Sequence, residues 1–422
     1  MERFVGLLGL LAILALAWGL SNNRKAINLR TVGWGLGLQF ALAVFVLKTN
    51  VGKGLFQWLG GLVTQLLEFT KQGSGFVFGP LVTGTGPDGS PLNLGFIFAF
   101  QVLPAIIFVG SLASIAYYVG LMQFVVSLVA KVMVKTMGTS GAESLYAVGT
   151  VFVGQSEAPL LIRPYLENMT RSELNAIMTG GMATIAGSVL FAYVGMLGPD
   201  WAPHLLAASI MGAPAGLVLA KILYPETEES ATAGEAKLEV VKREGSIIEA
   251  AAKGAADGMH LAFLVGTMLI AFIALIATIN GLLGWAGGLF GQALSLQLIL
   301  GWVFSPMAWL MGVPWAEAGT IGSLIGQKIV INEFVAYSEL TKMIPGAAGA
   351  VAGGTTLSPK AITVATFALC GFANFSSIGI NIGCIGGLAP TRQTDLAQLG
   401  FRAMLGGALA SSMTACLAGM LL

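Results

Sequence analysis

The sequence predicts an all-α polytopic membrane protein with eight transmembrane helices and two re-entrant helical hairpins. Hydrophobic residues make up 56% of its 422 positions and charged residues only 10%, whereas soluble domains are about 25% charged. Eight apolar runs are each long enough to cross the roughly 30 Å hydrocarbon core of a bilayer as a helix. Because so few polar side chains cannot cover a water-soluble globule, soluble enzymes and nucleic-acid-binding proteins are excluded.

The apolar runs set the predicted spans at approximately residues 4–20, 32–48, 95–119, 174–196, 202–223, 261–285, 361–387 and 397–421. We interpret the first run as a span and not as a cleavable signal, because its basic cluster follows the apolar stretch. The small-residue triplet at residues 15–17 keeps cleavage open as an alternative. Two histidines, His204 and His260, are too few for a His-rich metal site and are expected near span ends.

Loop charges orient the chain with its N-terminus outside. With eight alternating spans, 14 of the 21 Lys and Arg residues fall on inner segments, as the positive-inside rule requires. Residues 225–253, the longest polar stretch, then form an inner linker with a short amphipathic helix, and residues 84–89 form an outer turn. We therefore expect a multi-pass protein of the cell membrane.

Two broken apolar segments, residues 145–166 and 315–341, are predicted to be re-entrant hairpins. Each contains glycine and ionisable residues in its middle. Counting them as full spans would reverse the downstream topology and remove the charge bias. Non-helical backbone at membrane depth is tolerated where protein or a water-filled cavity surrounds it.

The two hairpins and the spans that follow them resemble each other. G-Q-S-E at 154–157 has a counterpart in G-Q-K at 326–328 with N-E at 332–333, and G-M-A-T at 181–184 has one in G-F-A-N at 371–374. Repeats of opposite orientation, each with a broken segment, indicate a secondary transporter whose substrate site lies near the membrane midplane. Chance similarity among 58 glycines is the alternative.

Glu157 and Glu333 are the most informative residues in these repeats. A carboxylate at membrane depth costs roughly 2.5–3.5 kcal/mol on insertion scales, so we expect a functional reason for two of them. A carboxylate only accepts hydrogen bonds and therefore suits a donor-rich solute such as a sugar or nucleobase. The alternative places both acids at interfaces, bonded to backbone groups at the hairpin tips.

Amides, hydroxyls and aromatic rings accompany the two acids at Gln155, Ser156, Asn332, Phe372, Asn374, Phe375, Ser376 and Ser377. An aromatic face beside amides and hydroxyls is typical of a site for a ring-shaped molecule. Helix packing through small polar residues is the alternative.

The glycines around Thr184 predict an unwound patch in the fourth span. Unwinding frees backbone carbonyls, and these, together with hydroxyls such as those of Thr150 and Thr184, suit a small hard cation. Glycine-mediated helix packing explains the same residues and is the alternative.

Three motifs resemble those of the concentrative nucleoside transporter family: G-Q-S-E-A-P at 154–159, N-E-F at 332–334 and C-G-F-A-N-F-S-S-I at 370–378. The resemblance extends over essentially the whole chain after residue 90. It implies eight spans and two hairpins in inverted repeats, a homotrimer, and in each protomer a scaffold and a mobile transport domain that moves as an elevator.

On this family architecture the chain divides into four parts. Residues 1–144 hold the first three spans, an outer loop and an inner amphipathic helix, and residues 224–314 hold the inner linker, the sixth span and a connecting helix. Both parts are mainly scaffold. Residues 145–223 form the first repeat, and residues 315–422 form the second repeat.

The resemblance also implies binding residues, position by position. The nucleobase would face Gln155, Ser156, Glu157 and Val189, and the ribose hydroxyls would contact Glu333, Asn374 and Ser377 with Phe372 beside them. In sodium-coupled members the ion lies between the first hairpin and the unwound fourth span, at positions that correspond to Thr150, Val153, Thr184 and Ile185. Sodium-dependent relatives often have Asn in place of Thr150, whereas some proton-coupled bacterial relatives have a small hydroxyl residue there. Because the Thr150 hydroxyl can still bind sodium, although with a shorter reach than an amide, sodium coupling is favoured and proton coupling is the alternative.

The sequence thus predicts uphill nucleoside uptake by cation symport, with no organic cofactor, no catalytic residue and no nucleic-acid partner. The expected partners are nucleosides, the coupling cation, membrane lipid and further copies of the chain. A carrier for another small polyhydroxylated or heterocyclic solute is the alternative. An intramembrane enzyme would need a nucleophile–base pair or metal cluster at depth, and a passive channel would not need inverted hairpins with buried acids.

Overall fold

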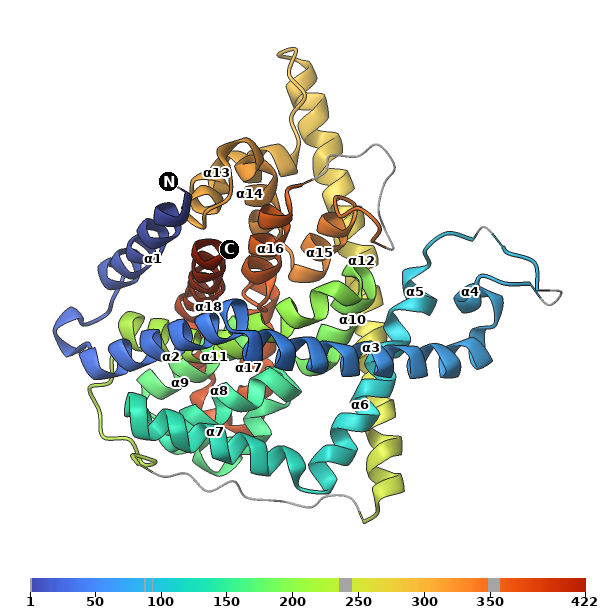
Figure 1. The fold of residues 1–422 in the computed structure, drawn as a ribbon. Helices are drawn as coiled ribbons and strands as arrows, with labels where there is room; N and C mark the ends of the chain where they lie inside the picture. Colours follow the sequence, from blue (N-terminus) through green and yellow to red (C-terminus); the bar gives the residue numbers. More distant parts are fainter. Residues whose placement is uncertain (1, 87–88, 93, 235–244, 348–356) are drawn as a thin grey trace.

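The computed structural model describes residues 2–86, 89–92, 94–234, 245–347 and 357–422. Within these ranges the chain folds almost entirely into helices, as the sequence predicts (Figure 1). Residues 87–88 of the predicted outer turn and residues 235–244 of the predicted inner linker lie outside the described residues.

The predicted spans are present as helices or as pairs of helices joined end to end. The unbroken ones are α1 (Glu2–Gly19), α2 (Leu29–Lys48), α11 (Ala202–Leu223), α12 (Ile247–Gly288) and α18 (Gln393–Leu421). The paired ones are α5 with α6 (Phe98–Gln101, Leu103–Tyr118), α9 with α10 (Arg171–Ala183, Gly187–Leu197) and α16 with α17 (Pro359–Leu369, Phe375–Leu388). The sixth span starts well before the predicted residue 261, because α12 continues beyond the bilayer-length apolar run.

Both predicted hairpins are also present. The first consists of α8 (Gly141–Val153) and the 3₁₀ stretch η2 (Ala158–Asn168), and the second of α14 (Trp315–Val330) and α15 (Glu333–Thr341). Ser140 and Glu143 form a capping box that starts α8. Gly154 ends α8 with a φ of +81°, a conformation that glycine adopts without a steric penalty.

One long helix was not predicted. The stretch expected as an outer connection contains α3 (Asn50–Phe78), which buries Phe56, Gly60 and Val63 on one face and exposes Trp58 and Phe76 on the other. Its polar residues interrupt every apolar run, so no span-length signal arises although the residues alternate as an amphipathic helix requires. The remaining helices are α4 (Pro80–Thr83), α7 (Leu121–Met137), α13 (Leu296–Leu310), η1 (Arg24–Ala26), η3 (Pro199–Trp201) and η4 (Pro390–Arg392).

The spans divide into a buried group and an exposed group. The most apolar window is 83–89% buried in α9–α10, α11 and α18, but only 22–28% buried in α2, α5–α6 and α12. The exposed helices α6 and α12 pack closely on each other, because a Cβ atom at Gly258 would lie 2.7 Å from the carbonyl oxygen of Ile106. The first group therefore forms the protein interior, and α6 and α12 form a wall beside it (Figure 1).

Candidate functional site

The two broken spans meet at their breaks in the interior. The amide N–H of Phe372, between α16 and α17, donates to the carbonyl oxygen of Thr184, between α9 and α10, over 3.3 Å. A Cβ atom at Gly371 would lie 2.9 Å from the carbonyl oxygen of Met182, so only glycine permits this approach. The backbones of the two breaks therefore lie directly against each other.

The tip of the first hairpin lies against the same region. A Cβ atom at Gly187 would lie 2.8 Å from the carbonyl oxygen of Phe152, and one at Gly154 would lie 2.6 Å from the Cβ atom of Ala186. The first hairpin is therefore packed on the start of α10, which carries Val189.

Glu333 starts the second arm of the second hairpin and lies in the interior with 4% exposure. The Tyr193 hydroxyl of α10 donates to its Oε1 over 3.1 Å, and Nδ2 of Asn374 donates to its Oε2 over 3.0 Å. The ring of Tyr193 packs between those of Phe334 and Tyr337, with centroids 4.8 and 4.3 Å away. Glu333 is therefore enclosed by side chains of α10 and of the segment before α17, within the protein.

The amide of Asn374 is fixed at both ends. Its Oδ1 accepts from the backbone N–H of Ser377 over 2.9 Å and from the Ser376 hydroxyl over 2.6 Å, which caps the start of α17. Its nitrogen is therefore held toward Glu333, so the second hairpin and the seventh span share one polar cluster.

A second polar chain connects the first hairpin to α17. Nε2 of Gln155 donates to the Ser377 hydroxyl over 3.0 Å, and Nδ2 of Asn381 donates to Oε1 of Gln155 over 2.8 Å. All three side chains are buried. Residues more than 220 positions apart along the chain are thus held in one hydrogen-bonded network.

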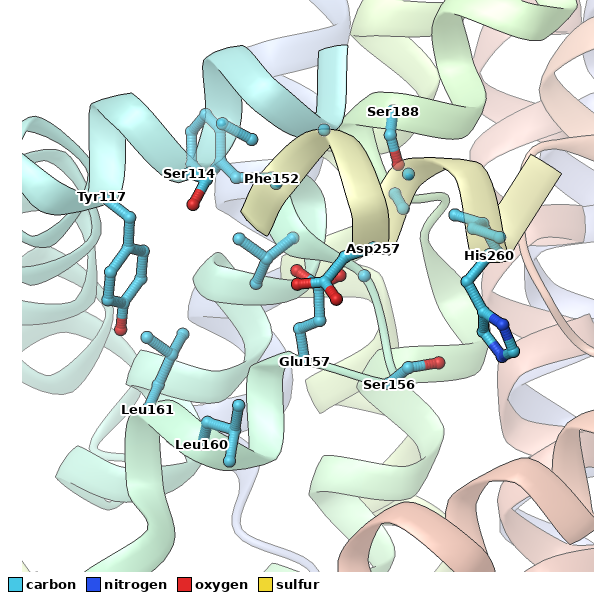
Figure 2. A pocket seen from close by; sticks show the side chains of 18 of the residues that line it. Ser114, Tyr117, Phe152, Ser156, Glu157, Leu160, Leu161, Ser188, Asp257 and His260 are labelled. Atoms are coloured by element: carbon cyan, nitrogen blue, oxygen red, sulfur yellow. The ribbon is translucent and has the colours of Figure 1, made fainter. Parts of the chain in front are cut away.

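A cavity of about 1090 Å³ opens between the first hairpin, α10 and the wall formed by α6 and α12. Ser156 and Glu157 of the hairpin and Asp257 and His260 of α12 line it (Figure 2). Drug-sized ligands occupy pockets of about 300–1,000 Å³, so the cavity is large enough for a nucleoside with water. His260, which was expected near a span end, lies within α12 and lines the cavity.

The eight predicted substrate-binding residues divide into two sets. Ser156, Glu157, Val189 and Phe372 line the cavity. Gln155, Glu333, Asn374 and Ser377 lie in the hydrogen-bonded networks and are buried. Members of the two sets are close neighbours in the chain. Gln155 of the networks precedes Ser156 of the cavity lining, and Asn374 follows Phe372 by two residues.

The four predicted cation ligands surround the contact between the first hairpin and the break in the fourth span. The hydroxyls of Thr150 and Thr184 donate to the carbonyl oxygens of Ala147 and Gly180 over 2.9 and 3.3 Å, which leaves their oxygen lone pairs free to accept. Val153 ends α8, and Ile185 lies in the break. A set made only of oxygen atoms fits a hard cation such as sodium.

Sequence reasoning missed three polar residues of this region: Tyr193, Asn381 and Asp257. Tyr193 follows Val189 by four residues and Asn381 follows Ser377 by four, so each lies one helical turn from a predicted site residue. That spacing was an available signal. Asp257 had no such signal, because only the packing of α12 brings it to the cavity.

The chain matches three family models over most of its length. They are described as Na+ dependent nucleoside transporter N-terminus (residues 8–81), nucleoside recognition (residues 99–200) and Na+ dependent nucleoside transporter C-terminus (residues 204–419).

Individual relatives agree with these models. The chain is 47% identical to an uncharacterized transporter of Bacillus subtilis, with 98% of both chains covered. It is 44% identical to sodium/nucleoside cotransporter 1 of the mouse, with all of this chain and 64% of that protein covered. A solved structure of CNTnw in an inward-facing substrate-bound state covers 100% of this chain and 98% of that one at 44% identity, with a TM-score of 0.91. A CNTnw variant in an outward-facing state gives a TM-score of 0.92 at the same identity and coverage.

Proposed function

Because this chain belongs to the concentrative nucleoside transporter family, we propose that it is a symporter that takes up nucleosides across the cell membrane. We propose sodium as the coupling ion, since the family models are described as Na+ dependent. The observation that carries the proposal is the hydrogen bonding of Glu333, which leaves the carboxylate partly free. We propose no catalytic step.

Glu333 has the acceptor capacity that a ribose ring needs. Each carboxylate oxygen has two lone pairs, and each accepts one side-chain hydrogen bond, from Tyr193 or from Asn374. Because the backbone N–H of Glu333 also bonds its own carboxylate, at least one lone pair remains to accept from the ribose hydroxyls. Hydrogen bonds to a charged group contribute about 1.5–3 kcal/mol each, so such contacts supply a large part of the binding free energy.

The cavity-lining set suits the nucleobase. Phe372 offers an aromatic face, Val189 an apolar one, and Ser156 and Glu157 offer acceptors for ring N–H and amino groups. Gln155 is held by Ser377 and Asn381, so its backbone and that of its neighbours at the hairpin tip are oriented before the substrate arrives.

The cavity opens on the inner side of the membrane under the predicted topology. Its lining includes Arg163, Glu167 and Lys253, which belong to segments that the charge distribution assigns to the inside. This arrangement supports an inward-facing state. We propose that the reverse state arises when the buried group of helices, with both hairpins, slides as an elevator along a scaffold that includes α6 and α12, and that exposed apolar scaffold faces join three copies of the chain.

The cation would couple to the substrate through the first hairpin. Bound between Thr150, Val153, Thr184 and Ile185, it would join the end of α8 to the break in the fourth span and so hold the hairpin tip in its binding conformation. One cation that crosses 100 mV inward contributes about 2.3 kcal/mol, which sustains a roughly fifty-fold gradient of a neutral solute.

The test is uptake of labelled uridine into proteoliposomes under an imposed sodium gradient, and separately under a proton gradient. Accumulation driven by sodium supports the proposal, whereas accumulation driven only by protons would show that the coupling ion is the proton and not sodium. Absence of uptake under both gradients would refute nucleoside symport. Competition by free sugars or nucleobases in the same assay tests the alternative of another polyhydroxylated or heterocyclic solute, and counterflow separates a carrier from a channel.

A further inference from the structure

Lys328, in the last turn of α14, is almost completely buried with 1% exposure. Its Nζ atom donates to the carbonyl oxygen of Ala368 over 2.8 Å and to the Ser411 hydroxyl over 2.6 Å. None of the ion pairs found among the described residues includes it. The carboxylate of Glu333, five positions along the chain, binds Tyr193 and Asn374 instead.

A buried ammonium group without a carboxylate partner is costly, because desolvation of a charge costs several kcal/mol. Glu333 attracts the ammonium group through space but does not contact it, so the groups in contact must supply the remaining stabilisation. Ala368 is the penultimate residue of α16, which ends at Leu369, and Lys328 is two residues from the end of α14 at Val330. The ammonium thus lies where the C-terminal ends of two helices approach each other.

The electrostatics of this arrangement balance. Each helix C-terminus carries the equivalent of about −0.5 elementary charge from its unpaired carbonyls. Two such ends sum to about −1, which one ammonium group offsets. Lys328 therefore offsets the helix ends of the second repeat, in addition to its through-space attraction to Glu333.

The first repeat has the same pair of helix ends, but in the part of the chain that the structure describes no basic residue is buried between them. Its hairpin helix α8 ends at Val153 and its broken-span helix α9 ends at Ala183, and neither has Lys or Arg in its last turn. The packing of Gly154 on Ala186 and of Gly187 on Phe152 brings these two ends together. The first repeat therefore has a negative site with no positive side chain of its own.

We propose that Lys328 is a tethered cation: its ammonium group permanently occupies, in the second repeat, the position between two helix ends that the coupling cation occupies reversibly in the first. This inference rests on the proposed cation-coupled function. Lys328 is a positioning residue, since it holds together α14, which leads to Glu333, and α16, which leads to Asn374. The half of the site around Glu333 is then preformed without ions, and only the half formed by the first hairpin depends on the coupling cation.

The test compares melting temperatures of the purified full-length protein in detergent, in choline chloride and in sodium chloride at equal ionic strength. Lys328→Ala removes the ammonium and leaves space for a sodium ion, whereas Lys328→Met removes it but fills the space with an apolar chain. Lys342→Met is the matched control, because Lys342 is an exposed lysine of the same hairpin that pairs with Glu339 at the surface.

In choline chloride we expect both neutral variants at position 328 to melt roughly 5 °C or more below the parent protein. Sodium should restore at least half of the lost melting temperature in Lys328→Ala, and the effect should grow with the sodium concentration. It should restore none of it in Lys328→Met. The control should respond to sodium as the parent protein does. The proposal is overturned if the Ala and Met variants respond alike to sodium, or if either one melts like the parent protein.

Lys328→Arg keeps the test decisive if the neutral variants do not fold. Folding of the Arg variant alone would support a required positive charge, whereas failure of all three variants would mean that the shape of the lysine matters and would overturn the proposal. None of these measurements uses a nucleoside. Absence of uridine uptake by the parent protein would therefore refute the proposed function and leave the sodium response of the variants readable.

Discussion

The replacement Glu333→Gln tests the ribose assignment most directly. Glutamine keeps the shape of glutamate but turns one oxygen into an NH₂ group. That group would face a donor, either the Tyr193 hydroxyl or Nδ2 of Asn374, now 3.1 and 3.0 Å from the two carboxylate oxygens. Against Asn374 this would be a donor–donor contact, whereas the Tyr193 hydroxyl can turn and accept from the NH₂ group. In either orientation the ribose loses one of its two carboxylate oxygens as an acceptor, and the other oxygen becomes neutral.

The expected effect follows from these contacts. A hydrogen bond to a charged group contributes about 1.5–3 kcal/mol, and two such bonds are affected, so a loss of roughly 3 kcal/mol in substrate binding is a conservative value. Since about 1.4 kcal/mol corresponds to a tenfold change, the apparent affinity for uridine should fall by roughly 100-fold, and uptake at low concentration should disappear.

The assay is initial uptake of labelled uridine into proteoliposomes over a range of uridine concentrations. Glu339→Gln is the control, because Glu339 lies on the same helix but forms an exposed pair with Lys342. A 2′,3′-dideoxynucleoside, which lacks the two neighbouring ribose hydroxyls, should compete poorly with uridine in the parent protein and nearly equally in Glu333→Gln. The reasoning would be refuted if the uridine KM of Glu333→Gln stayed within about threefold of the parent value. A threefold change corresponds to less than the 1.4 kcal/mol of a tenfold change.

Three further predictions test other parts of the site and fold. In Thr150→Val the loss of one oxygen ligand should raise the sodium concentration for half-maximal uptake by roughly tenfold with little change in uridine KM at saturating sodium, and an unchanged sodium requirement would exclude this ligand. In Glu157→Cys, uridine should slow reaction with an impermeant thiol reagent applied from the cavity side, whereas equal labelling rates would remove Glu157 from the site. Lys221→Met breaks the buried ion pair between Lys221 and Glu143, whose charged atoms are 2.8 Å apart. This should cost about 3–5 kcal/mol of stability and clearly lower the melting temperature. Lys71→Met, at an exposed lysine, is the control, and equal shifts in both variants would contradict a structural role for the buried pair.

The span positions were predictable because a membrane-spanning helix requires a simple pattern in the sequence. About 20 consecutive apolar residues are needed for each crossing, and that requirement is local in the chain. This pattern does not identify α3, because polar residues on one face interrupt its apolar run. It also does not locate the start of α12, because that helix continues past its apolar run. The hairpins were predictable for a different reason, since glycine and ionisable residues inside an apolar segment are tolerated only in special backbone.

The candidate site was predictable as a set of residues but not as an arrangement. Glu157 and Glu333 have the same chemistry in the sequence, yet one lines the cavity and the other is buried in a network with Tyr193 and Asn374. Gln155 and Ser156 are neighbours, and they too belong to different sets. No pattern along the chain distinguishes them, because the difference arises from contacts between segments about 200 residues apart.

The amino-acid sequence alone determined that this is an integral membrane protein, where its apolar helices lie, and which acids and amides interrupt its apolar segments, because each of these follows from local transfer free energies. The tertiary structure decided which of those residues meet. Only the convergence of helix ends shows that the second repeat neutralises its negative site with Lys328 whereas the first has no cation of its own. That asymmetry is a property of packed helix dipoles, and these act through space and not along the chain.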